Sequence, residues 1–120
     1  MKTKLIKPSE HEIQQALIDY LRLRGWYVMR LNSGKYSTGE GSHKRFVVGQ
    51  DAGTPDLMAF KEWYPEGAPN KSEVLLYFIE VKRKGNHPTD LQEAKMEELE
   101  RYGAICIVAT SIEDLKNQGL

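Results

Sequence analysis

The spacing of apolar residues predicts an amphipathic helix near the start of the chain. Its apolar positions follow the helical period and are Ile13, Ala16, Leu17, Tyr20 and Leu21. Ser9 and Glu12 have the spacing of a capping box, so we expect the helix to begin at Ser9. Gly25 follows the last apolar position and is expected to end the helix.

Two further helices are predicted near the end of the chain. The segment 89–103 has helical periodicity and closes at Gly103, and its expected apolar positions are Leu91, Ala94, Leu99 and Tyr102. A shorter helix is expected to follow Ser111, which is a favourable N-cap residue.

Runs of β-forming residues predict five strands, at 26–31, 45–48, 56–63, 73–82 and 104–109. The turn-rich segment 64–72 indicates that the strands on either side of it form an antiparallel hairpin. The polar, glycine-rich segment 32–54 is predicted to be irregular apart from its one strand. The order α, β, β, β, β, α, β, α predicts an α/β fold in which a mixed sheet is flanked by helices.

Composition narrows the class of protein. A length of 120 residues predicts a single domain, and 40% hydrophobic with 28% charged residues excludes a disordered chain. The single cysteine, Cys106, excludes a disulfide framework within the chain and indicates a reducing compartment. No apolar run suits a signal peptide or a membrane span, so we expect a soluble protein of the cytoplasm, without a membrane partner.

The apolar run 74–79 ends in charged residues. Alternation along a strand puts Glu80 and Lys82 on one face, continuing an apolar face toward the strand end. A Glu-x-Lys pair on a strand is more often a solvated ion pair. However, a hairpin turn centred near Ala68 would place Asp56 opposite Glu80, within about 5 Å. The preceding apolar run and this second carboxylate favour a functional site.

Two adjacent carboxylates repel each other unless one is protonated or a cation lies between them. A hard divalent ion fits such oxygen ligands, so we predict a Mg²⁺ site, with Mn²⁺ as an alternative ion. The expected ligands are Asp56, Glu80 and the main-chain carbonyl of Val81. Lys82, about 6.6 Å along the strand from Glu80, could position a water or neutralise charge on a phosphate.

Two helical residues are further candidates for the site. Glu10 shares the inward face of the first helix and has no structural explanation, whereas Glu12 is explained by the cap. Gln92 has two equally supported interpretations: a capping box with Thr89, or a residue of the site.

The motifs resemble those of a known family of nucleases. "GTPD" followed by "IEVK" is similar to the PD-(D/E)XK nucleases. The fuller series "SEHEIQ", "NSG", "GTPDL", "IEVK" and "LQ", followed by "RYGAICIVATSIEDL", resembles their virus-type replication-repair (VRR-NUC) branch. The resemblance covers about residues 9–115 and involves five motifs in the same order, each on the element expected for it.

The resemblance implies a restriction-endonuclease-like αβββαβ core and a role for each matched residue. Asp56 and Glu80 would be metal ligands, Lys82 the catalytic lysine, Glu10 an additional acid, which could also contact the metal, and Gln92 the supporting glutamine. The small stand-alone members of this branch further imply branched DNA, such as four-way (Holliday) junctions, as the substrate, and a homodimer with two sites.

Charge distribution indicates where nucleic acid would bind. The net charge is zero, but basic residues cluster in the glycine-rich segment and after the charged strand end, at Lys35, Lys44, Arg45, Arg83 and Lys84. Four glutamates occupy 93–100 on the opposite, acidic side. We therefore expect these five basic residues to contact DNA phosphates.

The leading hypothesis is a magnesium-dependent DNA endonuclease that hydrolyses backbone phosphodiester bonds. One alternative is a nuclease acting on flaps or ends. Another is a nucleic-acid-binding module that does not cut. A third is a structural or regulatory protein in which the acids of the site are accidental.

Overall fold

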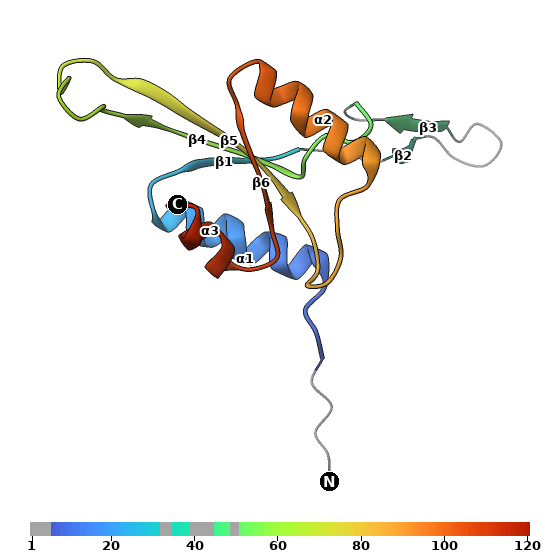
Figure 1. The fold of residues 1–120 in the computed structure, drawn as a ribbon. Coiled ribbons are helices and arrows are strands. Elements are labelled where there is room, and N and C mark those ends of the chain that lie inside the picture. Colours follow the sequence, from blue (N-terminus) through green and yellow to red (C-terminus); the bar gives the residue numbers. More distant parts are fainter. Residues whose placement is uncertain (1–5, 32–34, 39–44, 49–50) are drawn as a thin grey trace, which may run out of the picture.

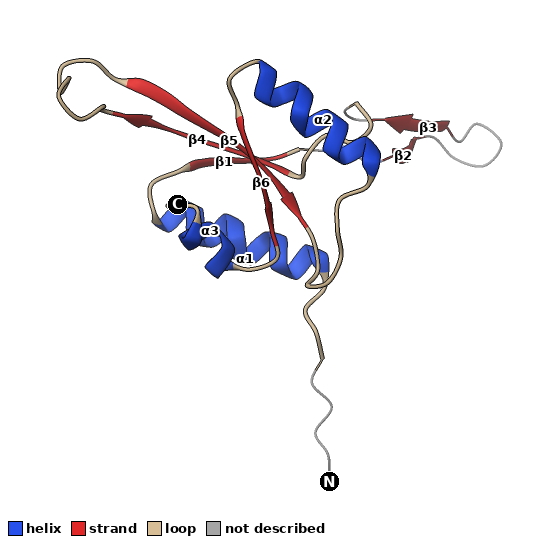
Figure 2. Ribbon diagram, in the orientation of Figure 1, coloured by secondary structure: helices blue, strands red, loops and turns tan. Residues whose placement is uncertain are grey.

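Four strands form a mixed sheet with helices on both faces (Figures 1 and 2). The computed structural model describes residues 6–31, 35–38, 45–48 and 51–120. The sheet order is β1-β4-β5-β6, with bounds β1 (Tyr27–Arg30), β4 (Leu57–Trp63), β5 (Glu73–Val81) and β6 (Ile105–Ala109). The helices are α1 (Glu10–Leu23), α2 (Asp90–Arg101) and α3 (Ile112–Asn117). The predicted mixed α/β sheet is confirmed.

Helix α1 begins and ends as its sequence predicts. The Ser9 hydroxyl accepts a hydrogen bond from the Glu12 N–H, and the Glu12 carboxylate accepts one from the Ser9 N–H, which completes the capping box. The chain leaves the helix through Gly25, at a φ of 88° that favours glycine. The buried stripe differs slightly from expectation, because Ala16 is exposed and Ile18 is buried. Helix α1 contacts both the sheet and α3, which explains a wider buried stripe.

The β4–β5 hairpin has the predicted register. Leu57 pairs with Ile79, and the antiparallel ladder runs to Trp63 opposite Glu73. Extending the register by one residue places Asp56 opposite Glu80. Strand β6 pairs with β5 in parallel, and the connection between them is made by α2, as parallel strands require.

The glycine-rich segment contains more structure than expected. Strand β3 (Arg45–Val48) is the predicted one, but it pairs with β2 (Lys35–Thr38), which was expected to be irregular. These two strands form a separate antiparallel sheet and do not join the main sheet. Strand β2 has the sequence KYST, which lacks the apolar run that identifies β3 (RFVV), so its pairing with β3 is what reveals it.

The main core lies between the sheet and the helices α1 and α3. Its fully buried side chains include Leu17, Leu21, Leu57, Ile79 and Leu115. None of the helices that the structure describes is both long enough and apolar enough to cross a membrane.

Helix α2 lies on the other face and buries a different stripe from the one predicted. Met96 is its one buried residue, whereas Leu91 is 57% and Tyr102 87% exposed. The helix contacts mainly β6, which is an edge strand, and the Cys106 thiol there donates a hydrogen bond to the Met96 carbonyl. A helix that covers only the sheet edge buries a narrow stripe, and the expected inward face is therefore wrong for Leu91, Ala94 and Tyr102.

Candidate functional site

The hairpin brings Asp56 against the end of β5. The Asp56 Oδ2 atom accepts a hydrogen bond of 2.8 Å from the Val81 N–H. The Asp56 carbonyl accepts one of 2.7 Å from the Leu31 N–H. Pro55, directly before it, is fully buried. Asp56, directly before β4, is therefore held on both sides: its carboxylate by β5 and its main-chain carbonyl by the residue that follows β1.

Glu80 is the one buried charged residue among those the structure describes, with 2% of its surface exposed. Its Oε1 atom accepts a hydrogen bond of 3.0 Å from Gln92 Nε2 and lies 3.6 Å from the ammonium of Lys82. Its Oε2 atom is buried and has no hydrogen-bond partner in the described part of the chain. A buried carboxylate oxygen without a partner costs free energy unless it is protonated or bound to a cation.

The surroundings of Glu80 favour its neutral form. Burial is the largest cause, and together with the negative charges of Asp56 and Glu10 it raises the pKa of this carboxyl to about 8. The ammonium of Lys82 opposes them by favouring the carboxylate. Strongly shifted acids beside a specific charge partner are typical of functional sites.

Gln92 serves both purposes that the sequence left open. Its Oε1 atom accepts a hydrogen bond of 2.9 Å from the Thr89 N–H, and its N–H donates to the Thr89 hydroxyl, which forms the capping box of α2. Its Nε2 atom donates to Glu80. The cap and the contact with Glu80 use different atoms, so one side chain can make both and fix α2 to the end of β5.

The two acids in the first turn of α1, Glu10 and Glu12, have different surroundings. Glu12 is exposed and completes the helix cap. Glu10 is partly buried, and its charge contributes to the raised pKa of Glu80. Of the two acids, Glu10 is therefore the one whose charge acts on Glu80.

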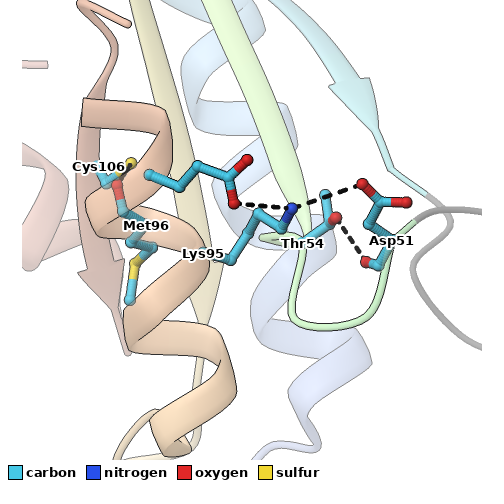
Figure 3. Close-up of polar contacts among 6 residues, drawn as sticks. Asp51, Thr54, Lys95, Met96 and Cys106 are labelled. Carbon is cyan, nitrogen blue, oxygen red and sulfur yellow. Dashed lines mark hydrogen bonds and ion pairs between the residues drawn. The ribbon is translucent and has the colours of Figure 1, made fainter. Parts of the chain in front are cut away.

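The loop before Asp56 is fastened to α2 by contacts that the sequence did not suggest. The Lys95 ammonium lies 3.5 Å from the Asp51 carboxylate and 3.3 Å from that of Glu98 (Figure 3). The Thr54 hydroxyl donates a hydrogen bond of 2.6 Å to the Asp51 carbonyl. Asp51 and Lys95 are 44 residues apart and belong to no motif, so only the fold reveals that they join the loop to α2.

Gly53, in the same loop, allows the backbone to approach α2 closely. A Cβ atom added there would lie 2.8 Å from the Leu91 carbonyl oxygen, and the glycine has a φ of 85°. Both the space and the conformation exclude a larger residue without local movement. The loop that leads to Asp56 therefore depends on this glycine.

The carboxylate oxygens at the site are of the kind that hard cations prefer, but they come from few side chains. Asp56 and Glu80 supply carboxylate oxygens, and the Glu80 oxygen without a partner is available. Within the part of the chain that the structure describes, no group of three or more His, Cys, Asp or Glu side chains could hold a metal ion. Glu10, Asp56 and Glu80 are thus not preassembled as a three-carboxylate cage. The two carboxylates fit an ion such as Mg²⁺, which keeps several non-protein ligands.

The predicted DNA-binding residues are only partly accounted for. Arg83 and Lys84 are exposed directly after β5. Lys35 and Arg45 are the first residues of β2 and β3, but their side chains lie outside the described part, as does all of Lys44. Among the predicted DNA-binding residues whose side chains the structure describes, Arg83 and Lys84 directly follow Lys82, at the end of the strand β5 that carries Glu80.

Comparison with known proteins gives no match for this chain. No protein-family model matches it, and the searches of curated proteins and of solved structures also found none. Its function must therefore be inferred from the arrangement of its own residues.

Proposed function

We propose that this protein is a metal-dependent DNA endonuclease. The observation that carries the proposal is Glu80: a buried carboxyl at a strand end, opposite Asp56, in contact with Lys82 and Gln92, and with one oxygen that has no partner. A structural ion pair would not need a second carboxylate beside a buried acid. A site that binds a cation needs this concentration of negative charge.

The residues that would hold the ion are Asp56 and Glu80, with the Val81 carbonyl as a further oxygen. A divalent ion held there would stabilise negative charge on a phosphate and acidify a water. Glu80 has to lose its proton before both of its oxygens can bind a cation. The pKa of about 8 therefore makes binding of the ion dependent on pH.

Lys82 and Gln92 supply the remaining chemistry. The Lys82 side chain is 13% exposed, so its ammonium can contact both Glu80 and a bound substrate. It would orient the attacking water. It would also stabilise the negative charge that develops on the phosphate oxygens as the water oxygen bonds to phosphorus and the bond to the leaving oxygen breaks. Gln92 would hold Glu80 in place through its 3.0 Å hydrogen bond.

The elements that carry these residues support the nuclease interpretation at a coarser level. Along the chain, α1, β1, β4, β5, α2 and β6 follow the αβββαβ order of the nuclease core that the motifs resemble. By the same resemblance, we propose a restriction-endonuclease-like fold, branched DNA as the substrate and a homodimer as the active form.

The test is cleavage of labelled four-way junction, duplex and flap DNA with Mg²⁺ or Mn²⁺. We expect the wild type to cut at least one substrate, and Lys82→Ala to be roughly 100-fold slower or worse, because the charge-stabilising ammonium is lost. Lys71→Ala is the matched control, since Lys71 is exposed in the hairpin turn between β4 and β5. It should cut at the wild-type rate.

The proposal is wrong if the wild type cuts none of these substrates with either ion. Binding of the same DNA without cleavage would identify a nucleic-acid-binding module instead. Calorimetry with Mg²⁺ separates these outcomes from a protein with no metal site, because Asp56→Ala should remove the heat of binding that the wild type gives.

A further inference from the structure

A cavity of about 450 Å³ lies between the loop after β5, the start of α1 and the segment that leads from β6 into α3. Three of its lining residues are cationic: Lys7, Arg83 and Lys84. Its apolar lining includes Pro8 and Ile13. Pockets of roughly 300 to 1,000 Å³ accommodate small organic groups, so this volume suits one nucleotide unit.

The three cations of this cavity are not used by the fold. Among the ion pairs between described residues, none involves Lys7, Arg83 or Lys84, and all three side chains are exposed. Lysine and arginine side chains left without carboxylate partners are available to an anion from solution.

Two carboxylates, Glu113 and Asp114, also line the cavity, so three positive side chains stand against two negative ones. The Asp114 Oδ2 atom accepts hydrogen bonds of 2.8 Å from both the N–H and the hydroxyl of Thr110, which fix this carboxylate in place without cancelling its charge. Glu113 is exposed and makes no hydrogen bond or ion pair among the described residues. The lining therefore keeps an excess of positive charge, which Glu113 reduces.

Two segments of the chain lead from residues of the proposed active site to residues that line the cavity. Arg83 and Lys84 directly follow Lys82 at the end of β5, and Lys7 and Pro8 precede Glu10 at the start of α1. Figure 1 shows the loop after β5 beside the start of α1. The Lys82 N–H also donates a hydrogen bond of 3.1 Å to the Ala109 carbonyl, which fixes this end of β5 to the end of β6.

We propose that this cavity is a subsite for one nucleotide of the DNA strand, next to the phosphate that is cut. The cations would bind its backbone phosphate, and Pro8 and Ile13 would contact its sugar. The inference rests on the proposed nuclease function, because the cavity would set the position of the strand relative to Lys82. It adds Lys7 to the residues that contact DNA.

The test measures DNA binding without cleavage, by fluorescence anisotropy of a labelled four-way junction and a duplex in EDTA. We expect Lys7→Gln, Arg83→Gln and Lys84→Gln each to weaken binding about fivefold to tenfold at low salt. Each should also reduce the slope of log affinity against log salt by about one, as loss of one phosphate contact does. Glu113→Gln should strengthen binding, and Lys71→Gln should leave it unchanged.

A second measurement locates the contact on the DNA. Single methylphosphonates, which carry no charge, are placed at successive positions of one strand. One position should weaken wild-type binding about fivefold to tenfold, and have no further effect on the Arg83→Gln/Lys84→Gln double variant. If every position weakens the wild type and this variant equally, the cations act only by long-range attraction and the subsite is wrong.

The two proposals can fail separately. Because binding is measured in EDTA, a position-specific loss supports the subsite even if the protein does not cut DNA. Conversely, the wild type could cut DNA while all three cation variants bind DNA as tightly as the wild type. That result would overturn the subsite but support the nuclease function.

Discussion

At the scale of single residues, Glu80 combines two properties that oppose each other. The fold holds its carboxyl almost entirely out of water, yet the proposed function requires it to be ionised. Burial and the neighbouring acids raise its pKa to about 8, whereas an exposed glutamate titrates near 4.5. A bound cation would relieve this conflict by compensating the charge of both Glu80 and Asp56.

The stability of the metal-free protein should therefore fall as the pH rises from about 4.5 to 8. In this window the unfolded chain has released the Glu80 proton, whereas the folded chain still holds it. The stabilisation is fully present below 4.5 and is lost as the pH approaches 8, with a total of the order of a few kcal/mol.

Urea unfolding in EDTA from pH 5 to pH 9 measures this dependence. Glu80→Gln cannot ionise, so it should lose most of the slope and be more stable than the wild type at pH 8. Mg²⁺ should then stabilise the wild type, increasingly so at higher pH, and leave the variant unchanged. If the free energy of unfolding depended on pH in the same way for both proteins, the raised pKa of Glu80 would be contradicted.

Variants of Thr89 and Gln92 can distinguish the contribution of Gln92 to the helix cap from its contribution to the proposed metal site. Thr89→Ala removes a cap hydroxyl and should cost about 1 kcal/mol of stability without changing the affinity for Mg²⁺. Gln92→Ala should lower both stability and Mg²⁺ affinity, because Glu80 also loses its hydrogen bond. Thermal unfolding and calorimetry measure the two effects. Equal Mg²⁺ affinities for the two variants would mean that Gln92 is only a cap.

At the scale of elements, the site depends on how the loop before β4 fits against α2. The loop carries Asp56, whereas α2 carries Gln92, and the two meet where Gly53 lies against the Leu91 carbonyl. Lys95 and Asp51 join the same two segments (Figure 3). This contact joins the loop that leads to Asp56 to the helix that carries Gln92.

We expect Gly53→Ala to destabilise the protein by roughly 1 to 3 kcal/mol and to weaken Mg²⁺ binding. The added Cβ would lie 2.8 Å from the Leu91 oxygen, so the loop or the helix must move. Gly67→Ala is the matched control, because Gly67 has a similar φ of 81° but no atom within 4 Å of an added Cβ. It should cost about 1 kcal/mol and leave Mg²⁺ binding intact. Equal effects in unfolding and calorimetry would show that only the backbone conformation matters.

At the scale of the whole molecule, the zero net charge hides two sides of opposite sign. Arg83 and Lys84 lie beside the proposed site, whereas Glu93, Glu97 and Glu100 line the surface of α2 that faces β6. This separation would direct a polyanion toward the end of β5 and away from α2.

If the substrate is a four-way junction with two equivalent cut positions, two sites related by a two-fold axis are required. We therefore expect sedimentation equilibrium at micromolar concentration to give twice the chain mass of 13.7 kDa. A protein that cuts both strands symmetrically while remaining monomeric would contradict the proposed homodimer. The measurement requires no DNA, so it is independent of the cleavage test.

Several features could be predicted from sequence because they depend on local rules. Capping residues set the starts of α1 and α2, and the position of the hairpin turn fixed Asp56 opposite Glu80. Alternation along β5 then put Glu80 and Lys82 on one face. Each of these predictions depends only on residue spacing within one helix start, one strand or one hairpin.

Other features depend on partners that are distant in sequence, so they can be recognised only in the folded protein. The buried stripe of α2 is centred on Met96 because the helix covers the edge strand β6, and β2 exists because β3 pairs with it. The contact of Gln92 with Glu80 and the cationic cavity that includes Lys7 also required the fold. By itself, the sequence determined which groups could form the site. The packing of α2 and α1 at the end of β5 decided which of them meet, because burial and charge depend on all neighbours in space.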